Sequence, residues 1–250
     1  MRGRWSAPLA AVLGGLVVPG PAWAFGRGAR VWLPQSVSSY APVIDQLFYF
    51  ILLLTGAVFV LVQGTLLWFL IRYRSRPGRQ AAYTHGNTTV EIVWTVIPAC
   101  LLLALAFYSQ NVWSYVRGTP PPHDLEVQIT AEQFVWNIAY PGPDGKFGTS
   151  DDLTTINQLH LPVRRTVLIH LRSKDVIHSF FVPQFRLKQD AVPGLTGHLW
   201  VTPMATGNFD IACAELCGLG HYRMRGYLTI EPSEAFEAWL AQQTQAEHGS

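Results

Sequence analysis

Two long uncharged stretches in the first half of the chain constrain its fold most. Residues 47–71 contain no charged side chain and are long enough to cross the hydrocarbon core of a bilayer. Residues 92–108 are about the minimum length for a spanning helix and contain Pro98, which membrane helices tolerate better than soluble ones. The alternative for the second stretch is a buried helix of a soluble domain. The short segment between the stretches favours a transmembrane hairpin, with helices at about residues 45–72 and 91–113.

The N-terminus resembles a removable export signal rather than a third span. Arg2 and Arg4 precede a short apolar run at residues 7–18, and Ala22-Trp23-Ala24 has the small-x-small pattern of a signal-peptidase site. The run is too short to cross a bilayer, and no cysteine near the site indicates a lipid anchor. We expect a signal peptide at residues 1–24 and the hairpin within residues 25–117.

The distribution of arginine predicts the orientation in the membrane. Four arginines follow the first helix, whereas Arg117 stands alone after the second. Because an excess of Lys and Arg in short loops marks the cytoplasmic side, the hairpin turn is expected inside and everything after residue 117 outside. The chain is therefore predicted to be a multi-pass protein of a bacterial inner membrane with a periplasmic C-terminal domain.

Residues 118–250 have the pattern of an all-β domain. Pro120-Pro121-Pro122 forms a stiff connector. Short alternating runs punctuated by Pro and Gly follow, at residues 125–129, 134–140, 166–171, 176–182, 199–202, 207–212 and 226–230. Such runs predict an antiparallel sandwich or barrel. Ser233 is placed to cap a closing helix, with Glu234 and Glu237 at its positive end.

The charge of this outer domain differs from that of the whole chain. Residues 118–250 contain nine Lys and Arg and fourteen Asp and Glu, a net charge of −5, although the full chain carries +2. An acidic domain suits a basic soluble partner, and ordinary solubility explains the charge equally well. No basic, aromatic-rich patch indicates nucleic acid, so we expect no nucleic-acid partner.

The segment most indicative of chemistry holds Cys213, Cys217, His221 and Met224 in a glycine-rich loop. Two cysteines in an exported domain can form a disulfide, but a disulfide needs neither His nor Met. Zinc could use the cysteines, His221 and one more histidine. Methionine is a poor zinc ligand, however, and the combination of thiolate, imidazole and thioether suits copper. Two cysteines can bridge a pair of copper ions, with one histidine on each metal.

A bridged pair requires a second histidine from elsewhere in the fold. His178 lies on the strand predicted at residues 176–182, upstream of the cysteine loop. One histidine on a strand and the other ligands on a later loop is the arrangement of copper-binding Greek-key barrels.

The hairpin, the barrel and the loop Cys-x-Glu-x-Cys-Gly-x-x-His-x-x-Met resemble subunit 2 of cytochrome c oxidase over essentially the whole mature chain. The resemblance implies a cupredoxin-like Greek-key barrel with a binuclear copper A centre. It implies as ligands His178, Cys213, Cys217, His221, Met224 and the backbone carbonyl of Glu215. In the family that glutamate's side chain also reaches a magnesium ion at the boundary with the catalytic subunit, near the position of Asp190.

The resemblance also implies partners. A c-type cytochrome would donate electrons, and subunit 1 would hold the haem groups where oxygen is reduced and protons are pumped, with subunit 3 alongside. Glu91 falls where the family has a carboxylate at the mouth of a proton path. Three rival interpretations remain. The first is a quinol oxidase, whose second subunit lacks the copper ligands, and the second is nitrous oxide reductase, which needs a further large domain. The third is a membrane-tethered copper-delivery protein.

One departure from the family concerns electron transfer from the donor. The family usually has Gln-Trp-x-Trp early in the barrel, and its first tryptophan receives the electron. This chain has Phe134 at that position, followed by Trp136, and Leu195 replaces an arginine common in the family. The docking site or the donor is therefore expected to differ from the mitochondrial type, as in bacterial oxidases that work beside alternative complex III.

In residues 144–152, clustered carboxylates suggest calcium, but a solvated turn is favoured because no full EF-hand loop is present.

Overall fold

The computed structural model describes residues 32–248, so the expected signal peptide at residues 1–24 lies outside the described residues. The chain divides into two compact units, residues 1–35 and 36–250. Of the first unit only residues 32–35 are described, and they form neither helix nor strand.

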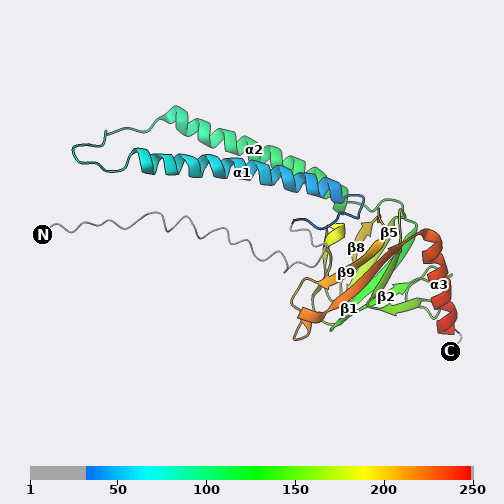
Figure 1. The fold of residues 1–250 in the computed structure, drawn as a ribbon. Coiled ribbons are helices and arrows are strands. Elements are labelled where there is room, and N and C mark those ends of the chain that lie inside the picture. Colours follow the sequence, from blue (N-terminus) through cyan, green and yellow to red (C-terminus); the bar gives the residue numbers. More distant parts are fainter. Residues whose placement is uncertain (1–31, 249–250) are drawn as a thin grey trace. The chain divides into compact units, whose positions relative to one another are not determined.

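The second unit begins with two long helices, α1 (Ala41–Arg72) and α2 (Thr88–Arg117) (Figure 1). Both are long and apolar enough to cross a membrane, and most of their apolar side chains are exposed. Both extend beyond the ranges expected from the sequence. Pro42 accounts for the early start of α1, because proline suits the first turn of a helix. α2 starts early because the Asn87 side chain accepts a hydrogen bond from the backbone N–H of Val90 at 3.2 Å.

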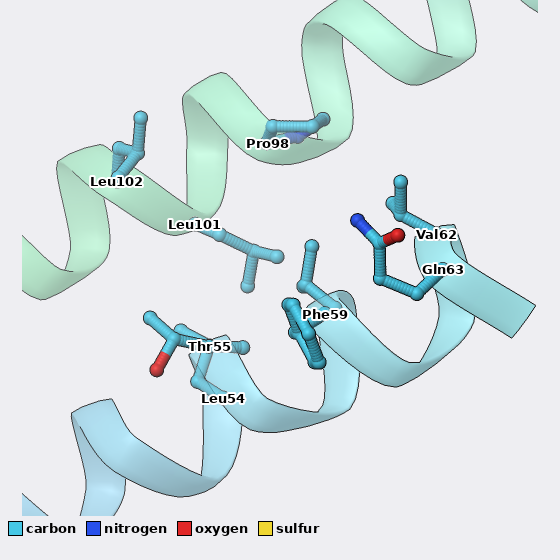
Figure 2. A pocket seen from close by; sticks show the side chains of 9 residues that line it. Leu54, Thr55, Phe59, Val62, Gln63, Pro98, Leu101 and Leu102 are labelled. Carbon is cyan, nitrogen blue, oxygen red and sulfur yellow. The ribbon is translucent and has the colours of Figure 1, made fainter. Parts of the chain in front are cut away.

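The helices enclose a pocket beside Pro98 (Figure 2). Its volume is about 470 Å³ and its walls are almost wholly apolar, with Phe59 of α1 and Leu101 of α2 among the lining side chains. Gln63 contributes a polar amide. The two helices therefore do not pack closely along this part of the hairpin.

The rest of the chain forms two five-stranded sheets and a final helix. The first sheet has the order β3-β2-β1-β5-β8 and the second β4-β10-β9-β6-β7. The strands are β1 (Leu125–Glu132), β2 (Val135–Tyr140), β3 (Leu153–Ile156), β4 (Gln158–Pro162), β5 (Val167–Ser173), β6 (His178–Val182), β7 (Leu187–Ala191), β8 (Gly197–Val201), β9 (Gly207–Cys213) and β10 (Arg225–Glu231).

The expected all-β class is confirmed, but the sheets are not wholly antiparallel. β1 pairs with β5 and β4 pairs with β10 in parallel, while the remaining strand pairs are antiparallel. The reason is that the chain crosses between the sheets: β4 lies in the second sheet, so β5 returns to the first and lies beside β1 in the same direction. This topology brings strands far apart in sequence into contact.

The core lies between the two sheets. Val127, Leu159 and Phe180 are fully buried, as is Trp136, whose ring meets that of Phe180 edge-on at 5.6 Å. Inward-facing residues alternate with outward-facing ones along β1 and β2, as a sheet with one buried face requires.

The closing helix α3 (Ser233–His248) begins one residue earlier than expected. The N–H of Phe236 donates to the carbonyl of Pro232, so Ser233 belongs to the first turn rather than capping it. Phe236 is buried, and Trp239 stacks on His160 at 3.9 Å. The helix is therefore fixed to β4 through aromatic contacts.

Candidate metal centre

Strand pairing brings the cysteine loop to the start of β6. β6 and β9 pair with Phe180 opposite Cys213, so His178, two residues before Phe180, lies on the same face of β6. The loop from β9 to β10 contains a short 3₁₀ helix, η3 (His221–Arg223). Hydrogen bonds from Cys213 N to Met224 O (3.3 Å) and from Ala214 N to Ser179 O (2.9 Å) close the loop against the sheet.

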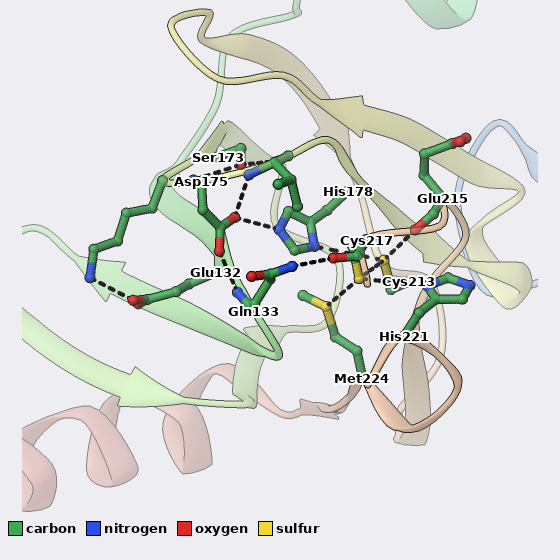
Figure 3. A network of polar contacts seen from close by, with 12 residues as sticks. Glu132, Gln133, Ser173, Asp175, His178, Cys213, Glu215, Cys217, His221 and Met224 are labelled. Atoms are coloured by element: carbon green, nitrogen blue, oxygen red, sulfur yellow. Dashed lines mark hydrogen bonds and ion pairs between the residues drawn. The ribbon is translucent and has the colours of Figure 1, made fainter. Parts of the chain in front are cut away.

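Six expected donor groups, five from the end of β9 and the loop that follows it and one from His178 on β6, lie together (Figure 3). The sulfur atoms of Cys213 and Cys217 are 3.7 Å apart, and one imidazole lies beside each sulfur. The measured separations are Cys213 Sγ to His178 Nδ1, 3.9 Å; Cys217 Sγ to His221 Nδ1, 3.6 Å; Cys217 Sγ to Met224 Sδ, 3.7 Å; and Cys213 Sγ to Glu215 O, 3.2 Å. Glu215 thus offers its carbonyl oxygen, while its carboxyl group points away from the sulfur atoms.

The donor set fits copper better than zinc or a disulfide. Both cysteines are free thiols. Burial, together with the neighbouring Cys213 thiol, raises the pKa of Cys217 to about 11, so a metal ion must displace its proton to bind. A thioether beside two thiols and two imidazoles suits copper, whereas zinc prefers a closed set of thiolate and imidazole. Two sulfurs with one imidazole beside each would provide donors for two metal ions.

Asp175 orients His178 and was not identified from the sequence. Its Oδ1 lies 2.8 Å from His178 Nε2, so the other ring nitrogen, Nδ1, faces the sulfur of Cys213. Burial opposes ionisation of Asp175, but hydrogen bonds from His178 and from the backbone N–H groups of Gln133 and Val176 hold its pKa below the usual value. Such a carboxylate–histidine pair fixes the tautomer of a metal ligand. The only signal in the sequence was an aspartate three residues before His178.

The turn between β1 and β2 braces the cysteine loop. Gln133 Nε2 donates to the carbonyl of Cys217 at 2.5 Å. The ring of Phe134 lies against Gly218 and Gly220, and a Cβ added to Gly220 would meet Phe134 Cδ2 at 2.5 Å. Trp136 is buried, with its ring centre 6.3 Å from that of His178. Both aromatic residues singled out in the sequence therefore lie beside the candidate centre.

The remaining residues noted in the sequence lie outside the cluster. Glu91 is exposed in the first turn of α2. Asp190, on β7, accepts hydrogen bonds from Ser179 Oγ at 2.7 Å and Lys188 Nζ at 3.1 Å. In the loop before β3, Asp144 and Asp152 accept backbone N–H groups of that same loop, at 2.8 and 2.6 Å, so these carboxylates hold the turn together.

Comparisons with known proteins agree with this geometry. Residues 26–112 match the family described as "Cytochrome C oxidase subunit II, transmembrane domain", and residues 119–230 match "Cytochrome C oxidase subunit II, periplasmic domain". The alternative cytochrome c oxidase subunit 2 of Bradyrhizobium diazoefficiens is 37% identical over 212 residues, which cover 76% of each chain. Cytochrome c oxidase subunit 2 of Thermostichus vulcanus is 31% identical, covering 84% of this chain and 78% of the relative.

Among solved structures, the periplasmic domain of subunit II of the cytochrome oxidase of Bradyrhizobium japonicum matches with a TM-score of 0.46 and 28% identity, covering 51% of this chain and 99% of that one. The family matches extend over both the helical hairpin and the β-domain. The chain therefore belongs to the cytochrome c oxidase subunit II family and is a subunit of a haem–copper oxidase, with its C-terminal domain on the periplasmic side of the membrane.

Proposed function

We propose that this subunit accepts electrons from a c-type cytochrome at a binuclear copper A centre and passes them to haem in subunit 1. There oxygen is reduced to water, coupled to proton pumping. The observation that carries the proposal is the paired arrangement of donors, with two buried sulfurs 3.7 Å apart and one imidazole on each. A copper-delivery protein would favour one labile ion at an exposed site, whereas the sulfur-bearing side chains here are buried.

The chain's own residues supply a rigid and dry setting. When bound, the copper pair supplies a site that takes up and releases one electron. Burial of Cys213, Cys217 and Met224 excludes water from the donor atoms. Asp175 holds the His178 ring, and Gln133 holds the carbonyl of Cys217. These contacts would restrain the donor atoms when the charge changes and so keep the reorganisation cost of each transfer low.

Electrons would arrive over the cysteine loop. Leu216, Leu219 and Tyr222 are strongly exposed there, and Phe134 lies directly beneath the same loop. Phe134 takes the place of the family's electron-receiving tryptophan, and Trp136 packs behind it against His178. Phenylalanine lacks the indole N–H, which supports a donor different from the mitochondrial type, such as one working with alternative complex III.

Three further roles belong to the proposal. The exposed carboxylate of Glu215 would hold magnesium at the boundary with subunit 1, while its carbonyl faces the copper ligands. Asp190 would help to order water near that ion. Glu91, exposed at the first turn of α2, would receive protons at the cytoplasmic side, and subunit 3 would complete the complex.

The experiment uses the full chain assembled with its oxidase partner. Cys217→Ser removes one of the two paired sulfurs, and Cys100→Ser is the matched control because Cys100 lies exposed in α2. Rapid mixing with a reduced c-type cytochrome should show electron uptake reduced by about a hundredfold or more in Cys217→Ser, and unchanged in Cys100→Ser. Equal uptake rates in both variants would remove the cysteine loop from the electron path.

A further inference from the structure

The outer face of the first sheet carries three histidines and a glutamate that the copper proposal does not use. His123 precedes β1, Glu126 lies on β1, His170 on β5 and His198 on β8. These strands are neighbours in the order β1-β5-β8, and His170 is directly opposite His198 in the antiparallel pairing. Each of these strand residues alternates with a buried core residue, so all three project from the face that is turned away from the core.

Contacts already join these side chains into one cluster. The carboxylate of Glu126 lies between two imidazoles, with Oε1 2.9 Å from His123 Nε2 and Oε2 2.7 Å from His170 Nε2. The rings of His170 and His198 meet edge-on at 5.0 Å. Phe147, from the loop between β2 and β3, meets the His170 ring at 5.4 Å. The cluster therefore has an apolar neighbour as well as three nitrogen ligands.

The cluster is partly shielded but open to an ion. The exposed fraction is 18% for the His170 side chain, 29% for His123 and 42% for Glu126. Hydrogen bonds from His123 and His170 hold the pKa of Glu126 below its usual value, so its carboxylate is ionised at neutral pH. An ionised carboxylate between two imidazoles, with a third imidazole against one of them, supplies the ligand types of a divalent metal site.

We propose that His170, His198, Glu126 and His123 bind a divalent transition-metal ion of the zinc class. Side chains directly opposite each other in an antiparallel pair have Cβ atoms about 5 Å apart, which allows two imidazoles to reach one ion. Imidazole and carboxylate are the ligands that zinc and neighbouring divalent metals accept, and no thiolate is present to favour Cu(I).

Binding requires the imidazole rings to move, because among the described residues the donor atoms of this cluster are not gathered within 4.8 Å of one another as those of His178, Cys213 and Cys217 are. His123 and His170 now face different oxygens of the same carboxylate, so the ion would replace the hydrogen-bond protons and the rings would turn toward it. The ion would tie β1, β5 and β8 to the connector that follows α2. This site lies on the sheet opposite to the one that carries His178 and Cys213, and the inference does not depend on the proposed electron transfer.

The test titrates zinc into the full chain in detergent with its cysteine centre first loaded with copper. Calorimetry should show one further zinc per chain, and the copper absorption should stay unchanged. His170→Gln and His198→Gln should each weaken zinc binding by about tenfold or more. His85→Gln, in the exposed loop between the membrane helices, is the matched control and should bind zinc as the unaltered chain does.

A thermal readout guards against variants that fail to fold. Zinc should raise the unfolding temperature of the unaltered chain and of His85→Gln, because a ligand that binds only the folded state stabilises it. Glu126→Gln, which keeps the shape of the side chain, should lose that rise while its copper absorption shows a folded domain. Absence of zinc binding in the unaltered chain, or binding that survives all three cluster substitutions, would overturn the proposal.

Discussion

Asp175 touches no proposed metal donor other than His178, yet its position decides which nitrogen of that histidine faces the sulfurs. The proposed donor residues could be singled out in the sequence, through the family resemblance, because they fall in one short loop plus one strand histidine. Asp175 and Gln133 could not, because their roles depend on strand pairing that brings the β1–β2 turn to the cysteine loop. At the scale of residues, the sequence therefore points to the proposed donors but not to the residues that hold them in place.

Replacing Asp175 with Asn should weaken copper binding without unfolding the domain. The asparagine keeps the size of the side chain but removes the charge that holds the His178 ring, so we expect copper affinity to fall by about tenfold. Competition with a copper chelator measures this change. Glu132→Gln is the control, because Glu132 pairs with Lys174 in the same network but does not touch a donor residue. Equal affinities for both variants would mean that Asp175 does not support the site.

Replacing Met224 with Leu should keep both copper ions but change the redox potential. Met224 is buried 3.7 Å from the sulfur of Cys217, and leucine fills a similar volume, so the free energy of unfolding should fall by less than about 1.5 kcal/mol. Loss of the thioether should shift the potential and slow electron uptake. A redox titration that gives the same potential as the unaltered chain would remove Met224 from the ligand set.

At the scale of elements, seven of the strands could be predicted and three, β3, β4 and β7, could not. β3 and β4 are short, with four and five residues, and β7, which reads Leu-Lys-Gln-Asp-Ala, has more polar than apolar residues. β7 is an edge strand whose two end residues alone are buried, so it lacks the strong alternation of β1. The parallel pairs β1–β5 and β4–β10 have no local signal, because they depend on where the chain crosses between sheets.

The contact between the cysteine loop and the β1–β2 turn gives a prediction about elements. Gly220→Ala should push the loop from the Phe134 ring, lowering the free energy of unfolding by about 1–3 kcal/mol and altering the copper absorption. Gly197→Ala is the control, because a Cβ there meets its nearest neighbours at an ordinary 3.8 Å. Chemical denaturation measures both. Equal free energies of unfolding for the Gly220→Ala and Gly197→Ala variants would show that the loop shifts at Gly220 without cost.

At the scale of the whole molecule, the arginine-rich turn and the two apolar stretches predicted the membrane hairpin. The composition also showed that the outer domain carries a net negative charge. Most acidic side chains of that domain have partners: Glu126 contacts two histidines, Glu132 pairs with Lys174 and Asp190 pairs with Lys188. The net charge alone could not reveal these pairs. Their hydrogen bonds lower the pKa values of these carboxyl groups, so the stability of the domain depends on pH.

Acid should therefore lower the stability of the periplasmic domain. A carboxyl group whose pKa is lower in the folded chain than in the unfolded chain stabilises the fold fully above its usual pKa, which is 4.5 for Glu126. This stabilisation is lost as the pH falls through the pKa of the folded chain. We expect the unfolding temperature, measured with a chelator present, to fall between neutral pH and about pH 3. Glu126→Gln should make this fall shallower. A steeper fall in that variant would contradict the assignment.

The most direct test of the account is the metal stoichiometry of the full chain. The chain, reconstituted with copper in detergent, would be examined by metal analysis and electron paramagnetic resonance. The paired donors around Cys213 and Cys217 predict two copper ions that share one unpaired electron, and Cys100→Ser should leave this result unchanged. One copper ion per chain with the spectrum of an isolated site, or none with Cys213 and Cys217 oxidised to a disulfide, would contradict the proposed electron relay.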